Sequence, residues 1–203
     1  MAYRETDRIR ERKAAQQATL LMDAEALVRE GGFEALTMQA LADRSGVAVG
    51  TLYRYFNGKD DLACAVFCRA TEREIAAVDA AMGKSDAPRT ALEAGLRAFA
   101  ERALRAPRLA WALIAEPVAP AVDAARLRYR ERWSDLYAGL LDAGMQHGHW
   151  PKQNSHLTAA AMVGALAEAL VGPLSRARQA PLHDSALIDD LITFCVRATG
   201  AHR

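Results

Sequence analysis

Apolar residues recur mainly at steps of three and four along this chain, the spacing that places side chains on one face of an α-helix. The first such segment spans residues 7–30, and its apolar positions are Ile9, Ala14, Leu20, Leu21, Ala24, Leu27 and Val28. Stretches with the strict alternation of a β-strand are hard to find. The pattern therefore predicts an all-α protein.

Glycine, proline and capping residues divide this pattern into about nine helices. Gly31-Gly32 is expected to end the first helix, because glycine commonly follows a helix C-terminus. Asp86, Ser155 and Asp184 are expected to cap three later helices. The helices expected after the first are residues 38–45, 49–55, 59–82, 86–105, 107–116, 122–147, 155–175 and 184–199. No low-complexity linker separates them, so the N-terminal unit is expected to dock directly on the rest.

Composition fits a folded soluble protein, with 51% hydrophobic and 25% charged residues in a chain of 203. The formal net charge of +1 neither favours nor excludes nucleic acid, so the positions of the charges must decide. One local basic cluster lies at the start, interleaved with Glu5, Asp7 and Glu11. It is either a DNA-contacting segment or a solvated helix face with salt-bridge partners. Its members are Arg4, Arg8, Arg10, Arg12 and Lys13.

Several features predict a cytoplasmic protein without a metal or cofactor. The start of the chain lacks a signal-peptide pattern, and the alanine-rich stretch 157–174 is too weakly hydrophobic to predict a membrane span. Three cysteines do not form an even disulfide framework, which fits a reducing compartment. Cys64 and Cys68 share a helix face, where small buried side chains are favoured over a redox or metal pair. The three histidines between residues 147 and 156 match no closed zinc pattern.

Residues 33–62 have the pattern of two short helices joined by a tight turn. Thr37 stands where the N-cap of the first helix belongs, and Gly46 permits the turn conformation. Leu41 and Leu52 are spaced to pack the two helices together. This arrangement is typical of a helix-turn-helix DNA-binding unit.

The second of these helices carries the side chains suited to a DNA duplex. Thr51, Tyr53, Arg54 and Tyr55 lie within one and a half turns, and such groups reach phosphates and base edges in the major groove. Lys59, at the start of the next helix, would add a phosphate contact. The segment therefore predicts operator DNA as a partner.

This stretch closely resembles the DNA-binding signature of the tetracycline-repressor (TetR/AcrR) family. The resemblance implies an N-terminal three-helix DNA-binding domain over residues 1–58. It also implies a C-terminal helical ligand-binding and dimerisation domain over residues 59–203. The matching residues are Phe33, Thr37, Leu41, Ala42, Gly46, Val47, Gly50, Thr51, Leu52, Tyr53, Tyr55, Phe56, Lys59 and Leu62.

The resemblance also implies a role for each DNA-facing residue. The positions that match phosphate contacts are Thr37, Tyr53, Tyr55 and Lys59, and for both tyrosines the alternative is packing between helices. The positions that match base-edge contacts are Gln39, Val49, Gly50, Thr51 and Arg54. Among these, Arg54 suits guanine and Gln39 suits adenine. Val49 is apolar where many relatives carry a polar residue, which leaves a thymine methyl as its partner.

The resemblance places a small-molecule effector pocket among the middle helices. The expected lining residues are Phe67, Cys68, Phe99, Trp111, Arg126, Tyr129, Arg130, Trp133 and Met162. The alternative is that the aromatic residues are plain core. If Arg126 and Arg130 point inward, the effector is amphipathic with an acidic group, and if they point outward they are merely solvated.

The function predicted is that of a ligand-responsive repressor that binds a near-palindromic operator as a homodimer. The alanine-rich segment 157–170 and the wide apolar stripe of the last helix fit a dimer interface. An activator of the same fold remains open, as does an all-α enzyme or small-molecule carrier with a vestigial DNA-binding unit. No Ser/His/Asp arrangement, glycine-rich phosphate loop or paired metal-ligand helices favour an enzyme.

Overall fold

A computed structural model describes residues 7–176 and 184–200 of the chain. Arg4 and Glu5 of the N-terminal cluster lie outside these residues. The described residues form nine helices and no strand, which confirms the all-α prediction. The helices are α1 (Asp7–Ala35), α2 (Met38–Ser45), α3 (Val49–Leu52), α4 (Lys59–Met82), α5 (Pro88–Arg105), α6 (Pro107–Ile114), α7 (Pro120–Gln146), α8 (Ser155–Arg176) and α9 (Ser185–Ala198).

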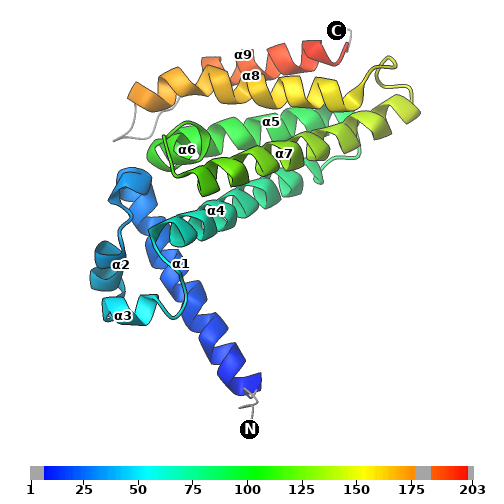
Figure 1. The fold of residues 1–203 in the computed structure, drawn as a ribbon. Coiled ribbons are helices and arrows are strands. Elements are labelled where there is room, and N and C mark those ends of the chain that lie inside the picture. The colour runs from blue at the N-terminus through cyan, green and yellow to red at the C-terminus, as the bar shows by residue number, and fades with distance from the viewer. Residues whose placement is uncertain (1–6, 177–183, 201–203) are drawn as a thin grey trace.

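Helices α1 to α3 form a small unit at one end of a layered bundle made by α4 to α9 (Figure 1). The start of α1 projects beyond this unit, and α8 and α9 form the layer farthest from it. The core of the small unit also includes Leu109 and Ala112 of α6, with Val122 and Ala125 of α7. The small unit therefore docks directly on the bundle, as the absence of a linker predicts.

Helix α4 contributes to both hydrophobic cores. Leu62 and Val66, near its start, are buried in the core of the small unit. Ile75 and Val78, further along the same helix, are buried in the core of the bundle. One continuous helix therefore joins the two cores.

The paired glycines interrupt α1 as the sequence predicts, although a further helical turn follows them. Gly32 adopts φ 75°, a left-handed conformation that kinks the helix, and one further turn continues to Ala35. Glycine permits this kink because it has no Cβ to clash with the backbone.

The second helix of the helix-turn-helix unit is also shorter than expected, because α3 ends at Leu52 and residues 53–55 form a tight turn. Asn154, rather than Ser155, caps α8, since its Oδ1 accepts from the N–H of Leu157 at 3.0 Å. Asp86 makes no cap at the start of α5, whereas Asp184 caps α9 as predicted.

Candidate DNA-binding and ligand sites

The turn between α2 and α3 is fixed by local hydrogen bonds. The hydroxyl of Thr37 accepts from the N–H of Ala40 at 3.0 Å and so caps α2. Gly46 ends the helix with φ 65°, and the N–H of Val47 donates to the carbonyl of Ala42 at 3.1 Å. These bonds orient α3 relative to α2 from sequence-local contacts alone.

Polar contacts then hold α2 against α1. Arg44 donates both guanidinium ends to the carboxylate of Glu30, each at 2.8 Å. The hydroxyl of Ser45 donates to Asp23 at 2.7 Å. The hydrogen bond from Arg44 lowers the pKa of the Glu30 carboxyl, which keeps the pair charged. The helix-turn-helix unit is therefore a rigid platform on the long helix.

Helix α3 and the turn after it divide their side chains between core and surface. Leu52 and Phe56 are buried in the core of the small unit. Tyr53 between them is 56% exposed, and the adjacent Arg54 is also exposed. The phenol of Tyr53 and the guanidinium of Arg54 are thus both exposed to solvent, as contact with a DNA duplex requires.

The other residues predicted to contact DNA differ in their exposure and in their hydrogen bonds within the protein. Gly50 and Lys59 are exposed, whereas Val49 and Thr51 are half-buried. The amide of Gln39 donates to Asp43 at 2.7 Å, so its nitrogen must leave that partner before it can read a base.

Tyr55 is placed differently from Tyr53. It is half-buried, and its hydroxyl donates to Gln16 of α1 at 2.7 Å. This bond favours the packing alternative for Tyr55, because its hydroxyl already has a partner within the protein.

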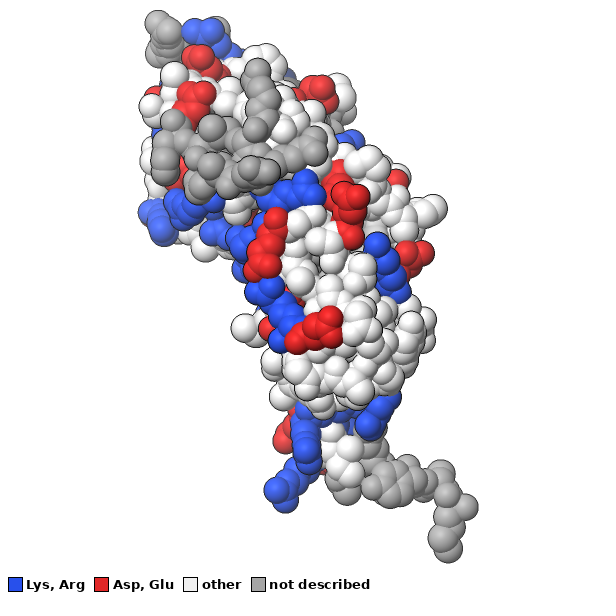
Figure 2. Space-filling view, turned by 90° about the vertical axis from the view of Figure 1, so that its left-hand side faces the viewer, with Lys and Arg blue, Asp and Glu red and all other residues white. Residues whose placement is uncertain are grey.

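Basic side chains surround the projecting start of α1. Lys and Arg gather there in the lower part of Figure 2, next to the residues drawn in grey. Arg8, Arg12 and Lys13 are exposed, and Arg10 is paired with Asp7. The end of the molecule that carries α1 to α3 therefore presents cationic groups beside α3.

A cavity of about 100 Å³ lies between α4, α5, α6, α7 and α8. Most of its wall is apolar or aromatic. Phe99 and Trp133 pack edge to face with their ring centroids 5.2 Å apart, and Phe67 and Tyr129 pack in the same way with their centroids 5.8 Å apart. The predicted pocket residues that line it are Phe67, Phe99, Arg126, Tyr129, Arg130 and Trp133.

Three residues predicted for the pocket do not line this cavity. Met162 is buried in the core of the bundle, 1% exposed. Trp111 faces a separate hollow beside the end of α1. Cys68 is half-buried next to Cys64 and Tyr129, where burial raises the pKa of its thiol. Helical spacing gave the correct helices for these residues but not the direction in which each side chain points.

Sequence reasoning also missed wall residues. Besides the predicted Phe67, helix α4 presents Thr71, Glu74 and Val78 to the cavity at steps of three and four. This stripe was visible in the sequence, but only contact with α5 and α7 shows that it faces a hollow.

Arg126 lines the cavity without being available to an acidic ligand. Its guanidinium donates to the carbonyls of Leu113, Ala112 and Glu116 at 3.0, 3.3 and 2.9 Å, and it pairs with Asp123. These bonds close the C-terminal end of α6. Burial lowers the pKa of Arg126, and Asp123 only partly offsets this.

Arg130, by contrast, is exposed at the edge of the cavity, where it also borders a second surface hollow. Its guanidinium makes no hydrogen bond or ion pair with the described residues. It is therefore the one of the two arginines that an anion could reach.

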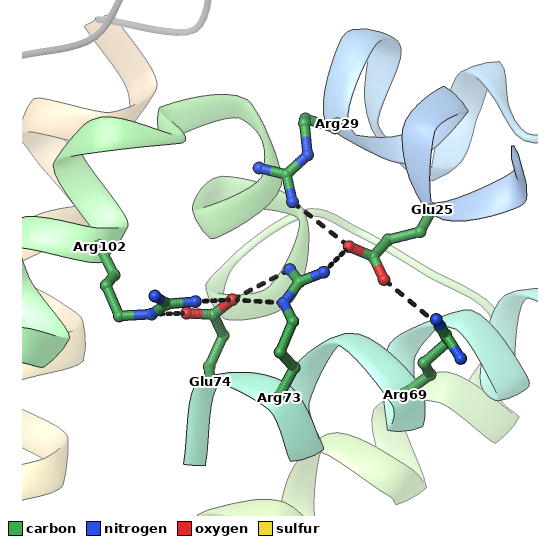
Figure 3. A network of polar contacts seen from close by, with 6 residues as sticks. All are labelled: Glu25, Arg29, Arg69, Arg73, Glu74 and Arg102. Atoms are coloured by element: carbon green, nitrogen blue, oxygen red, sulfur yellow. Dashed lines mark hydrogen bonds and ion pairs between the residues drawn. The ribbon is translucent and has the colours of Figure 1, made fainter. Parts of the chain in front are cut away.

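A network of charged side chains connects the cavity wall to α1 (Figure 3). Arg102 of α5 donates to Glu74 of α4 at 2.5 and 3.1 Å, and both line the cavity. Arg73 bridges Glu74 to the buried Glu25 of α1. Burial raises the pKa of Glu74, but the hydrogen bonds from Arg102 and Arg73 outweigh it and lower the pKa overall.

Arg29 and Arg69 complete the network around Glu25, at 3.3 and 3.7 Å. Three arginines thus face one carboxylate that is only 8% exposed. Removal of that carboxylate would leave their charges mutually repelling.

A second connection joins α6 to the kink of α1. The carboxylate of Glu116, two residues beyond α6, accepts from the N–H groups of Phe33 and Glu34 at 3.1 and 3.2 Å. Arg108 of α6 donates to the carbonyl of Gly31. These hydrogen bonds of Glu116 and Arg108 to α1 are called the Glu116 clasp below. A Cβ at Gly32 would lie 2.5 Å from Glu116, so the clasp requires glycine at this position.

The outer layer of the bundle is unusually apolar where it faces away from the core. Within the described residues, Ser155–Ser175 of α8 is the one helical stretch apolar and long enough to cross a membrane, with mean hydropathy 1.6 and 28% of it buried. Leu157 of α8 is 66% exposed and Phe194 of α9 is 57% exposed. A membrane span and a protein interface both present such a surface.

Known proteins resemble this chain in two ways. Residues 20–66 match the sequence model for bacterial regulatory proteins of the tetR family. The HTH-type transcriptional repressor KstR of Rhodococcus jostii is 48% identical over 62 residues, which is 30% of this chain and 27% of that protein. The aligned segment thus spans about a quarter of the curated relative's length.

Solved structures resemble the whole fold. The regulator FadR of Bacillus subtilis, in complex with stearoyl-CoA, has a TM-score of 0.75 at 18% identity and covers 93% of this chain and 100% of its own. The fatty acid degradation regulator FadR of Bacillus halodurans has a TM-score of 0.73 at 18% identity, and covers 90% and 97%. At these identities the likeness extends to the fold.

Proposed function

Because residues 20–66 match the sequence model for bacterial regulatory proteins of the tetR family, we propose that this chain is a cytoplasmic, homodimeric repressor of the TetR type that releases operator DNA when a small molecule binds. The observation that carries the proposal is the outward presentation of Tyr53 and Arg54 from a turn anchored by buried Leu52 and Phe56. Three unpaired thiols fit the reducing cytoplasm.

Recognition of the operator divides between sequence-independent phosphate contacts and base-specific contacts. Thr37, Tyr53 and Lys59 hold phosphates and so set the register of α3 in the major groove. Arg54 reads guanine with two parallel hydrogen bonds. Val49, at the start of α3, contacts a thymine methyl.

Dimerisation through α8 and α9 explains the apolar outer layer. A second copy would cover Leu157 and Phe194, whereas an isolated chain leaves them in water. Two copies of α3 related by a two-fold axis then meet successive major grooves, with half-sites roughly 34–36 Å apart.

Ligand binding would reach the DNA-binding unit by the two routes described above. A molecule in the cavity presses on Glu74 and Arg102, which connect through Arg73 to α1. It also presses on Leu109 and the rest of α6, whose end carries the Glu116 clasp. A change in the angle of α1 alters the separation of the two α3 copies, and a coupling of about 1–3 kcal/mol suffices for release.

Fluorescence anisotropy of labelled DNA from upstream of its own gene tests this function. We expect tighter binding to this DNA than to unrelated DNA of equal length and composition. We also expect both affinities to fall as salt rises, because phosphate contacts release counterions. Equal affinity for the two DNAs would contradict a sequence-specific regulator and favour a carrier or enzyme that keeps an unused DNA-binding unit. Expression of a reporter gene placed behind the same upstream DNA then distinguishes a repressor, which lowers expression, from an activator, which raises it.

A further inference from the structure

Thr71 contributes a buried hydroxyl without a partner to the cavity wall, within the described residues. It lies one turn before Glu74 on the cavity-facing stripe of α4 and is 5% exposed. Its Oγ1 is buried and has no hydrogen-bond partner in the part of the chain that the structure describes. A buried hydroxyl without a hydrogen-bond partner destabilises the empty protein. A ligand group that bonds to this hydroxyl gains binding free energy, because it supplies the missing hydrogen bond.

Other helical hydroxyls in the same chain satisfy themselves through the preceding turn. Thr19 donates to the carbonyl of Ala15 at 3.2 Å, and Ser134 donates to that of Arg130 at 2.9 Å. Thr71 makes no such bond to Phe67, although the helix offers the same acceptor. Its hydroxyl can therefore turn toward a molecule in the cavity without the loss of an existing hydrogen bond.

The charged groups of the wall are committed or peripheral. Glu74 and Arg102 neutralise each other at 2.5 Å. Arg126 is occupied by three backbone carbonyls, and Arg130 stands exposed at the edge. An ionised ligand group placed deep in this cavity would lose its hydration without gaining a free counter-charge.

We propose that the effector is a small uncharged molecule, apolar over most of its surface, whose single hydroxyl or carbonyl oxygen hydrogen-bonds to Thr71. A threonine hydroxyl both donates and accepts, so it serves either group. The cavity is of the same order as the ~150 Å³ cavity that holds benzene. The inference rests on the proposed ligand-responsive function, and it differs from the acidic effector expected from Arg126 and Arg130.

Calorimetry of the full chain without DNA tests the inference with three probes of one shape: phenol, benzene and benzoate. We expect phenol to bind about tenfold more tightly than benzene, as one good hydrogen bond provides, and benzoate to bind most weakly. Thr71→Val keeps the shape and removes the hydroxyl. It should weaken phenol about tenfold and leave benzene within about twofold. Thr71→Ser should retain the preference for phenol.

Three results would overturn the inference. The first is an unchanged preference for phenol over benzene in Thr71→Val. The second is benzoate binding that exceeds phenol binding and is lost in Arg130→Ala. The third is the absence of saturable phenol binding at roughly 10 mM. The thermal midpoint of Thr71→Val should not fall, since no bond is removed, and a fall would show that Thr71 is structural. If phenol binds through Thr71 but leaves DNA binding unchanged, the inference stands and the proposed ligand response fails.

Discussion

The DNA-binding unit and the ligand cavity differ in how their functional residues are distributed along the chain. The former uses residues 37–59, a single local segment. The latter draws its wall from five helices between residues 67 and 167. The major groove of B-form DNA admits a helix in much the same way for every protein that reads it, which restricts the sequence of the local segment. A cavity depends on how distant helices happen to pack, and many sequences serve equally well.

The largest expected effect concerns the interface that joins two DNA-binding units. Phe194→Glu should convert the dimer to a monomer, because it places charge in the proposed α8–α9 interface. Loss of the second half-site should weaken operator binding by about 10²–10⁴-fold. Sedimentation velocity measures the oligomeric state. Met22→Glu, at a side chain 58% exposed on α1, is the matched control and should stay dimeric. A dimeric Phe194→Glu would place the interface elsewhere.

The next effect concerns Gly32, at the kink of α1 that Glu116 holds. Gly32→Ala should lower the free energy of unfolding by about 2–4 kcal/mol, since it strains a left-handed backbone and displaces Glu116. Gly50→Ala is the control, because open space surrounds its Cβ position and its φ is not positive. It should leave stability unchanged or raise it, while weakening DNA binding. Chemical denaturation of both variants measures the difference, and equal stabilities would remove the argument for the clasp.

A smaller effect follows from the charge network of Figure 3. The folded-state pKa of Glu74 is lowered, so its stabilising contribution is complete above its unfolded pKa of about 4.5 and is lost as pH falls below it. Glu74→Gln should therefore make the loss of stability in acid shallower. Denaturation at several pH values measures the slope. The same slope in both proteins would exclude Glu74 as a contributor.

The smallest effect is electrostatic and confined to the DNA-binding unit. Lys59→Ala should weaken binding about equally on all sequences and reduce the slope of log affinity against log salt by about one. A loss restricted to one operator sequence would instead make Lys59 a base-reading residue.

Most of the fold was predictable because the residues that begin or end a helix act through contacts with their neighbours in the sequence. Pro107, Gly46 and Asp184 each stand at a boundary that the structure confirms. The break at Gly32 was also predictable, but the further turn to Ala35 was not, because that turn is held by Glu116, which lies 83 positions from Phe33.

The candidate sites divide in the same way. The exposure of Tyr53 and Arg54 followed from their place opposite Leu52, a local relation. The role of Arg126 could not be foreseen, because three backbone carbonyls of another segment occupy its guanidinium. Thr71 escaped notice because nothing in its helix distinguishes a buried hydroxyl with a partner from one without.

The most direct test of the account compares two single-arginine variants on the same upstream DNA. Arg54→Ala removes the proposed base contact, whereas Arg105→Ala removes an exposed arginine at the end of α5. At one fixed salt concentration, the account predicts that the dissociation constant of Arg54→Ala rises by about 10–100-fold while that of Arg105→Ala stays within about twofold of the unmodified protein. Unchanged binding by Arg54→Ala would contradict recognition through α3.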